Sequence, residues 1–248
     1  MTTPLVTVGI PFFDNEDTLR HAVNSTLGQT HSRLEVILID DGSTDSSLSI
    51  ARICAKADPR ISVITDGVNR GLINRLNQLI DLAQGEYFAR MDADDLMDPE
   101  RIAKQLACLV VHPEVDVVTS GVFSLDANFQ VLGKRFCDAR TPKTHEVFRN
   151  GGGLVHASMM AKTSWFRENK YRTGYERAED RELFTRTFGK SVYKILPEPL
   201  YYYRDVQGIT LPKYLASYRS ERKALRANWR GRIPFTTCLL YTSPSPRD

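Results

Sequence analysis

The chain of 248 residues is long enough to bury a full hydrophobic core, and its 42% hydrophobic and 25% charged residues are ordinary globular values. These values argue against a disordered chain, and the net charge is only +3. No run approaches the roughly 18 consecutive apolar residues that a membrane-spanning helix needs. The start, MTTPLVTVGIPFF, has no basic region or small-residue cleavage site, so we expect no signal peptide.

The four cysteines lie far apart, without a Cys-x-x-Cys pair. This spacing argues against a disulfide scaffold and against a structural zinc site, and it favours a reducing compartment. We therefore expect a cytoplasmic protein.

Two kinds of periodicity alternate over residues 1–120. Short β-branched runs predict buried parallel strands at residues 5–10, 34–39, 61–65, 86–91 and 115–120. Helical patterns lie between them; the first has Asp17 as its expected cap, and the fourth has Asp98 as its expected N-cap with Pro99 at the first helical position. Alternating strands and helices predict an α/β fold with an open, mostly parallel sheet.

The pattern changes after Gly121. VFSLDANFQVLGKRF predicts a hairpin with its turn at residues 126–128, and PKTHEVFRN predicts a short helix before a flexible triple glycine. ERAEDRELFTRTF is helical in pattern and SVYKILPEPLYYYR is strand-like. No repeat occurs, and no linker is long enough to separate independent domains.

The C-terminal part is basic. Residues 213–232 hold seven basic residues and one acid, Glu221, so residues 213–237 predict a basic amphipathic helix. This helix has either a solvated face or peripheral contact with an anionic membrane, at the inner face of the plasma membrane. No nucleic-acid-binding motif accompanies the charge, so we expect no nucleic acid partner.

The last residues, CLLYTSPSPRD at 238–248, match the conceptual translation of a sequencing adapter. We expect this stretch to be non-native, and the native sequence to be truncated near Thr237.

Acidic residues follow the predicted strands, in PFFDNED, DDGSTD, DGVNRG and DADD. In open α/β sheets, ligands bind beyond the carboxyl ends of the strands. Turns and helix caps explain any one of these clusters. Three acidic clusters at one edge, without basic residues to balance them, favour a divalent cation with a phosphate ligand.

Several other kinds of site are not predicted. The chain has no Walker lysine loop and no Gly-x-Gly-x-x-Gly after its first strand, which argues against P-loop and dinucleotide-binding proteins. The DADD cluster lacks the glycine and the glutamate of an EF-hand loop. No His-Glu-x-x-His motif occurs, and the histidines lack a ligand-like spacing.

Five motifs resemble, in order, those of family-2 glycosyltransferases: VTVGIPFFDNEDTLRHAVNSTLGQT, EVILIDDGSTDSS, NRG followed by LN, GEYFARMDADD and AEDREL. The resemblance runs over residues 5–204. It implies a GT-A fold, a Rossmann-like α/β sheet flanked by helices with a smaller acceptor-side subregion. Residues 1–120 would be the nucleotide-sugar-binding half and residues 121–212 the acceptor-binding half.

The resemblance also implies an activity. Such bacterial enzymes are inverting and move a sugar from a nucleotide-diphosphate sugar to a hydroxyl of a glycan or lipid-linked glycan acceptor. They take part in cell-surface polysaccharide biosynthesis, including lipopolysaccharide. The chain would then be a hexosyltransferase that uses Mg²⁺ or Mn²⁺.

On the donor side, the resemblance assigns contacts with the base and ribose to Pro11, Phe13, Asp14 and Asp41. Asp92 and Asp94 match the D-x-D pair, so Asp94 would ligate the metal, and Asp92 would hold ribose or help to place the metal. The metal would offset charge on the departing nucleoside diphosphate.

On the acceptor side, Asp180 matches the expected general base, with Glu179 beside it. The alternative is that both acids only begin a helix, where the dipole favours them. His156 would contact acceptor or diphosphate, or be structural. Arg204 would contact the diphosphate or form a surface salt bridge.

The sequence departs from the family pattern after the N-x-G turn. Leu76 stands where relatives carry arginine, and Arg75 lies one residue earlier, roughly 100° away on a helix. Whether Arg75 or Arg90 replaces the family arginine therefore stays open. Arg90 either supplies this charge or faces solvent.

Two alternatives to an active glycosyltransferase stay open. A sugar-phosphate nucleotidylyltransferase would need a Gly-rich basic loop after the first strand, where PFFDNED stands. A catalytically inactive nucleotide-sugar-binding relative would be favoured by a broken acceptor side, but both acids of AED are present.

Overall fold

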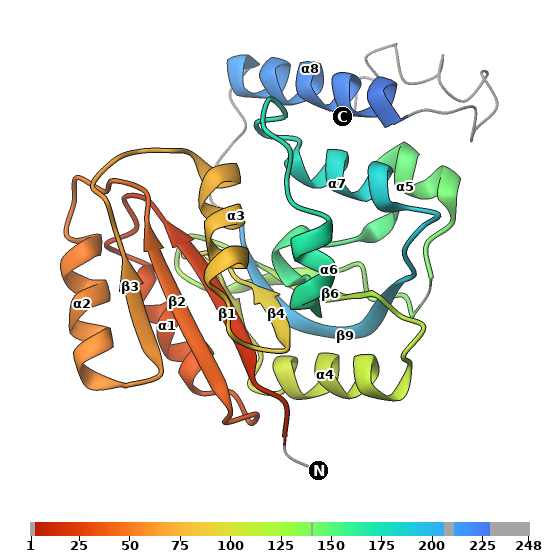
Figure 1. Ribbon diagram of the computed structural model, residues 1–248. Coiled ribbons are helices and arrows are strands. Elements are labelled where there is room, and N and C mark those ends of the chain that lie inside the picture. Colours follow the sequence, from red (N-terminus) through yellow and green to blue (C-terminus); the bar gives the residue numbers. More distant parts are fainter. Residues whose placement is uncertain (1–2, 140, 206–210, 229–248) are drawn as a thin grey trace.

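The computed structural model describes residues 3–139, 141–205 and 211–228 and consists of a central sheet with helices on both faces (Figure 1). The predicted adapter stretch and residues 229–237 lie outside this part of the chain. The strands are β1 Val6–Phe12, β2 Leu34–Asp40, β3 Ile61–Ile64, β4 Tyr87–Arg90, β5 Leu96–Met97, β6 Val117–Leu125, β7 Val131–Arg135, β8 Met160–Lys162 and β9 Tyr193–Arg204. The helices are α1 Leu19–Leu27, α2 Ser47–Ala57, α3 Leu72–Leu82, α4 Arg101–Val111, α5 Thr144–Asn150, α6 Thr163–Glu168, α7 Glu179–Thr187 and α8 Leu211–Asn228, with 3-10 turns at Gly151–Gly153 and His156–Ser158.

The sheet is mixed, and its longest pairings are parallel. Its order is β3-β2-β1-β4-β8-β6-β9-β5, with β7 paired to β6. Strands β3, β2, β1 and β4 run parallel, as do β6 and β9, whereas β8, β7 and β5 pair antiparallel. This arrangement confirms the predicted α/β fold with a sheet flanked by helices.

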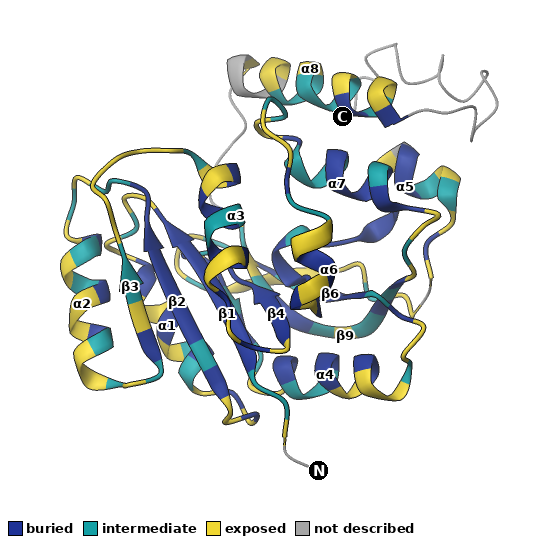
Figure 2. Cartoon of the chain, in the orientation of Figure 1, coloured by how far each residue is buried: buried dark blue, intermediate teal, exposed yellow. Residues whose placement is uncertain are grey.

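The core has two layers because helices cover both faces of the sheet. On β2, Val36 and Leu38 face the layer of α1, α2 and α4, whereas Ile37 and Ile39 face the layer of α3, α6 and α7. Figure 2 shows β1 and β2 buried along most of their length. Strands covered on both faces are apolar at successive positions, which explains the unbroken β-branched runs.

Two predicted helix starts are wrong, by one and by two residues. Helix α1 has Thr18 rather than Asp17 at its N-cap, because the backbone N–H groups of Thr18 and Leu19 already donate to the carbonyl of Asn15. Helix α4 begins at Arg101.

Asp98 lies in a turn before α4. Its backbone N–H donates to the carbonyl of Leu200, and its side chain accepts from the N–H of Glu100, the actual N-cap. The short strand pair β5–β9 thus holds this segment out of the helix.

The second half follows the predicted order of elements. Strands β6 and β7 form the expected antiparallel hairpin, with a longer turn, residues 126–130, than expected. The triple glycine forms a buried 3-10 turn rather than an exposed flexible segment. In the described residues, no helix is both long and apolar enough to cross a membrane.

Candidate active site

The acidic loop follows β4 at the centre of the sheet. Asp92, Asp94 and Asp95 each offer a carboxylate oxygen, and these oxygens lie within 4.8 Å of one another. Burial, and then the charge of Asp92, raises the pKa of Asp94. Burial, followed by the charges of Asp92 and Asp94, raises the pKa of Asp95 well above its usual value. The loop therefore concentrates negative charge that a cation would stabilise.

The residues of this loop fit a Mg²⁺ or Mn²⁺ ion. Hard divalent cations take carboxylate oxygens as ligands. Oδ2 of Asp95 is buried without a hydrogen-bond partner, whereas its Oδ1 accepts from the backbone N–H of Arg204 at 2.7 Å. Asp94 and Asp92 would be the ligands of a cation in this cluster, and its charge would also stabilise the unpaired Oδ2 of Asp95.

Arg90 faces the acidic loop and not solvent. Its Nη2 lies 2.6 Å from Oδ1 of Asp92, and only 4% of its side chain is exposed. Burial alone would lower the pKa of Arg90, but the charge of Asp92 and other acidic groups raises it overall. Arg90 is therefore the charged counterpart of Asp92 inside the site.

Two further residues, Arg101 and Tyr201, support this loop, and the sequence did not predict them as part of the site. Arg101 is fully buried, donates from Nη2 to the carbonyl oxygen of Arg90 at 2.8 Å, and lies 5.0 Å from the centre of the Tyr201 ring. The Tyr201 hydroxyl accepts a hydrogen bond from the N–H of Asp92 at 3.1 Å. The available signal was Arg101 with Gln105, two polar residues one turn apart on a helix face that is otherwise apolar.

The predicted base-binding acid, Asp41, lies at the carboxyl end of β2. Its carboxylate accepts from the backbone N–H groups of Arg70 and Gly71 and from Nε of Arg75 at 2.8 Å. Arg75 is fully buried and also contacts Oδ1 of Asp66 at 2.6 Å. Arg75 therefore does reach this edge of the sheet, where it holds Asp41 in place.

The other predicted donor-side residues lie at the end of β1. Pro11 is buried in the strand, whereas 44% of Phe13 is exposed. Asp14 has a φ of 50°, and its Oδ1 accepts from the backbone N–H of Thr44 at 2.7 Å. The loops that follow β1 and β2 are thus tied together, with Phe13 open to solvent beside them.

Glu179 and Asp180 begin helix α7. Burial raises the pKa of Asp180, and Oδ1 of Asp180 accepts from the N–H of Arg181 at 2.7 Å. Burial, and then the charge of Asp180, raises the pKa of Glu179, on which Arg90 and Asp92 also act. The predicted acceptor side therefore lies within electrostatic reach of the acidic loop.

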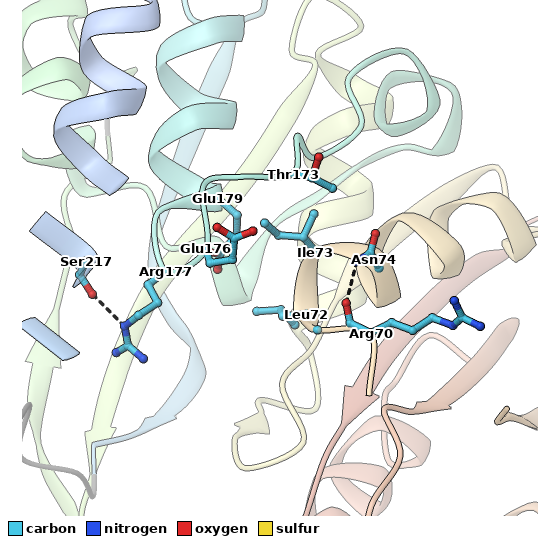
Figure 3. A pocket seen from close by; sticks show the side chains of 10 residues that line it. Arg70, Leu72, Ile73, Asn74, Thr173, Glu176, Arg177, Glu179 and Ser217 are labelled. Carbon is cyan, nitrogen blue, oxygen red and sulfur yellow. Dashed lines mark hydrogen bonds between the residues drawn. The ribbon is translucent and has the colours of Figure 1, made fainter. Parts of the chain in front are cut away.

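A cleft of about 530 Å³ opens beside Glu179 (Figure 3). One wall is the start of α3, with Leu72, Ile73 and Asn74, and the other is the segment that leads into α7. Ser217 of α8 also lines it. Apolar and polar groups thus meet in a hollow large enough for part of a ligand.

His156 and Arg204 make specific internal contacts. A ring nitrogen of His156, Nε2, lies 2.7 Å from the Tyr171 hydroxyl, and burial lowers the pKa of His156 well below its usual value. The Arg204 side chain donates to the carbonyl of Ala127 at 2.9 Å, and its guanidinium lies 5.1 Å from the centre of the Phe129 ring. Arg204 thus joins the β6–β7 hairpin to the acidic loop.

The fold is that of the GT-A class of glycosyltransferase structures. The structure of Staphylococcus aureus TarS in complex with UDP-GlcNAc matches with a TM-score of 0.71 and 19% identity, over 88% of this chain and 65% of that one. A mannosyltransferase of Pyrobaculum calidifontis, in complex with GDP-Man and Mn²⁺, matches with a TM-score of 0.63 and 19% identity, over 99% of this chain and 67% of that one.

The family follows from the sequence itself. Glycosyl transferase family 2 matches residues 7–194, and the chain belongs to this family. EpsE of Bacillus subtilis, assigned as a glycosyltransferase, is 36% identical over 210 residues, which cover 82% of this chain and 73% of EpsE. WcaA of Escherichia coli, assigned as a glycosyl transferase of colanic acid biosynthesis, is 30% identical over 74% of this chain and 66% of WcaA. The chain spans less than two thirds of the solved TarS fragment.

Proposed function

We propose that the chain transfers a hexosyl group from a nucleotide-diphosphate sugar to a hydroxyl of a glycan or lipid-linked glycan. The observation that carries this proposal is the approach of two acidic groups from opposite halves of the chain. The acidic loop with Asp92 lies on one side, and Glu179 and Asp180 lie on the other. Residues 1–120 would bind the donor, and residues 121–212 would bind the acceptor.

The donor would lie along the carboxyl ends of β1, β2 and β4. Phe13 would contact the base, with Asp14 near the ribose, Pro11 shaping the strand end and Asp41 bonding the base. Arg90, held against Asp92, would attract the phosphates, and Arg204 would add positive charge beside Asp95. UDP-GlcNAc and GDP-Man in the solved structures support a nucleotide sugar as the ligand class.

The metal would be Mg²⁺ or Mn²⁺, held by Asp94 with Asp92. When bound, this ion supplies a Lewis acid for the negative charge that develops on the leaving diphosphate. The acidic cluster and the Mn²⁺ in the mannosyltransferase structure support this assignment.

Asp180 would take the proton from the acceptor hydroxyl as its oxygen attacks the anomeric carbon. The bond from the acceptor oxygen to the anomeric carbon forms while the bond from that carbon to the diphosphate oxygen breaks. This single displacement inverts the configuration at the anomeric carbon. Burial, which raises the pKa of Asp180, makes this carboxylate a stronger base than an exposed one. Glu179 and His156 would contact the acceptor.

The product would be a cell-surface polysaccharide. WcaA is assigned to colanic acid biosynthesis, and TuaG of B. subtilis, 37% identical over 42% of this chain, to teichuronic acid biosynthesis. The basic helix α8 would bring the protein to the anionic inner face of the plasma membrane, where lipid-linked acceptors reside.

Calorimetry with UDP, GDP and TDP, each with and without Mn²⁺, tests the donor site. We expect Mn²⁺ to strengthen the binding of at least one nucleotide, and Asp94→Ala to remove this gain. Asp98→Asn is the matched control, because Asp98 is a nearby acid outside the acidic cluster, and its side chain accepts from the N–H of Glu100 and from the Tyr202 hydroxyl. An unchanged response to Mn²⁺ in Asp94→Ala would refute Asp94 as a metal ligand.

A further inference from the structure

The segment that leads into α7, residues 172–178, has a backbone that needs support. Arg177 has a φ of 66° and Gly174 a φ of 84°. A residue other than glycine in the left-handed region is strained and persists only where its surroundings hold it there. The segment ends directly before Glu179 and Asp180, so its conformation sets where these acids lie.

Helix α8 holds this segment by side-chain contacts. Nε of Arg177 donates to Oγ of Ser217 at 2.9 Å, as Figure 3 shows. Nζ of Lys223 donates to the carbonyl oxygen of Gly174 at 2.8 Å and lies 4.8 Å from the centre of the Tyr175 ring. The strained Arg177 is thus fastened to α8 directly.

The same face of α8 also holds α7. Nε of Arg181 donates to Oε1 of Glu221 at 2.8 Å, and the other guanidinium nitrogens of Arg181 donate to the carbonyls of Val147 and Phe148 in α5. Asn228 at the end of α8 donates to the carbonyl oxygen of Glu182, next to Arg181, and to Oγ1 of Thr185, one turn further along α7. Arg181, the neighbour of Asp180, is thereby fixed between two helices.

The contacts to Arg177, Arg181, Glu182 and Thr185 come from one stripe of α8, whereas the long side chain of Lys223 reaches Gly174 from another side. Ser217, Glu221, Ala224 and Asn228 are spaced by four, three and four residues, which places them on one side of a helix. Ala224 is fully buried there and Asn228 is 9% exposed. Figure 1 shows α8 lying across α7, on the side away from the sheet.

We infer that α8 positions the acids that begin α7, and that Ser217 and Glu221 are positioning residues for the acceptor side of the site. The inference rests on the proposed function, since it gives α8 a part in that same reaction. A base misplaced by about 1 Å can cost roughly a hundredfold in rate. The proposed donor contacts Phe13, Asp41 and Asp94 lie on other elements, so loss of the α8 contacts should affect the proton transfer more than nucleotide binding.

The experiment compares hydrolysis and binding in the full chain. Hydrolysis of UDP-GlcNAc, UDP-glucose or GDP-mannose uses water as the acceptor and still needs the base, whereas calorimetry with UDP and Mn²⁺, or GDP and Mn²⁺, reports the donor site alone. We expect the double variant Ser217→Ala/Glu221→Ala to lower kcat of hydrolysis roughly tenfold or more, with a much smaller change in KM and nucleotide affinity.

Two comparisons separate positioning from loss of folding. Glu221→Gln keeps an acceptor for Arg181 and should retain most of the rate, and Ser220→Ala removes a hydroxyl from the next turn, for which the described residues show no bond to segment 172–178. Trypsin should cleave after Arg177 faster in Ser217→Ala than in Ser220→Ala.

A double variant with the rate of the wild type would overturn the inference alone, as would an equal fall in kcat and nucleotide affinity. Absence of both hydrolysis and nucleotide binding in the wild type would instead overturn the proposed function, and the inference with it.

Discussion

Arg75 shows how a single residue organises the predicted donor side. It lies fully buried between two acids that follow different strands, Asp41 after β2 and Asp66 after β3. Its Nη2 also donates to the carbonyl oxygen of Val68. Arg75 therefore ties together the loops on which the proposed base contact depends.

Replacing Arg75 should destabilise the protein far more than replacing Arg70. Both arginines contact Asp66, but 53% of the Arg70 side chain is exposed and none of the Arg75 side chain is. We expect Arg75→Met to lower the free energy of unfolding by about 3 kcal/mol, because it leaves Asp41 without its buried partner. Arg70→Met should cost less than about 1 kcal/mol. Urea unfolding measures both values, and equal losses would contradict this role of Arg75.

The elements of the fold could be predicted from sequence because each has a local signature. Buried strands appear as β-branched runs, and helices appear as amphipathic patterns, so their order followed directly. The two-residue strand β5 has no such signature, since its pairing with β9 joins residues that are about a hundred positions apart. The start of α4 was misplaced for the same reason, because that strand pair, and not a local cap, determines it.

The loop after β2 offers a test at the scale of an element. Gly42 and Gly71 both have positive φ values, 79° and 81°. A Cβ at Gly42 would lie 2.8 Å from the backbone nitrogen of Asn69, whereas a Cβ at Gly71 would meet no atom within 4 Å. The two loops beside Asp41 thus approach each other more closely at Gly42 than any side chain allows.

Gly71→Ala should therefore cost about 1–2 kcal/mol of stability from backbone strain alone. Gly42→Ala should cost more and should also weaken nucleotide binding, because the loop of Asn69 must move away. Urea unfolding and calorimetry measure the two effects. An equal loss of unfolding free energy in both variants would contradict the close approach of these loops at Gly42.

At the scale of the whole molecule, α8 has two different sides. One side holds α7, and another presents basic residues, among them the exposed Arg219 and Arg226. Each basic residue near an anionic surface contributes about 1 kcal/mol of binding free energy. Attachment to a membrane through this side would leave the contacts with α7 intact.

We expect the protein to bind phosphatidylglycerol vesicles at low salt, to be released by added salt, and to ignore phosphatidylcholine vesicles. The double variant Arg219→Ala/Arg226→Ala should weaken binding roughly thirtyfold. Arg52→Ala/Lys56→Ala removes two exposed basic residues of α2 instead and is the matched control. An equal loss of vesicle binding in both double variants, measured by co-sedimentation, would show that the basic side of α8 is an ordinary solvated face.

Much of the site could also be foreseen, since the acidic motifs follow strands whose carboxyl ends share one edge. The partners of these residues could not. Arg101 and Tyr201 beneath the acidic loop, and Arg75 against Asp41, are contacts between distant positions that no periodicity reveals. The orientation of Arg90 could not be predicted, because a side chain in a strand can face either side of the sheet. Only the packing of neighbouring elements determines that Arg90 is buried against Asp92.

Asp180→Asn tests whether this chain transfers a sugar with Asp180 as the base. We expect the variant to lower the release of nucleoside diphosphate from the preferred nucleotide sugar by roughly 10²–10⁴-fold, while calorimetry shows nucleotide binding as tight as in the wild type. Asn keeps the size of Asp180 and its bond to the N–H of Arg181, so the fold of α7 is retained. Release at the rate of the wild type would contradict the account.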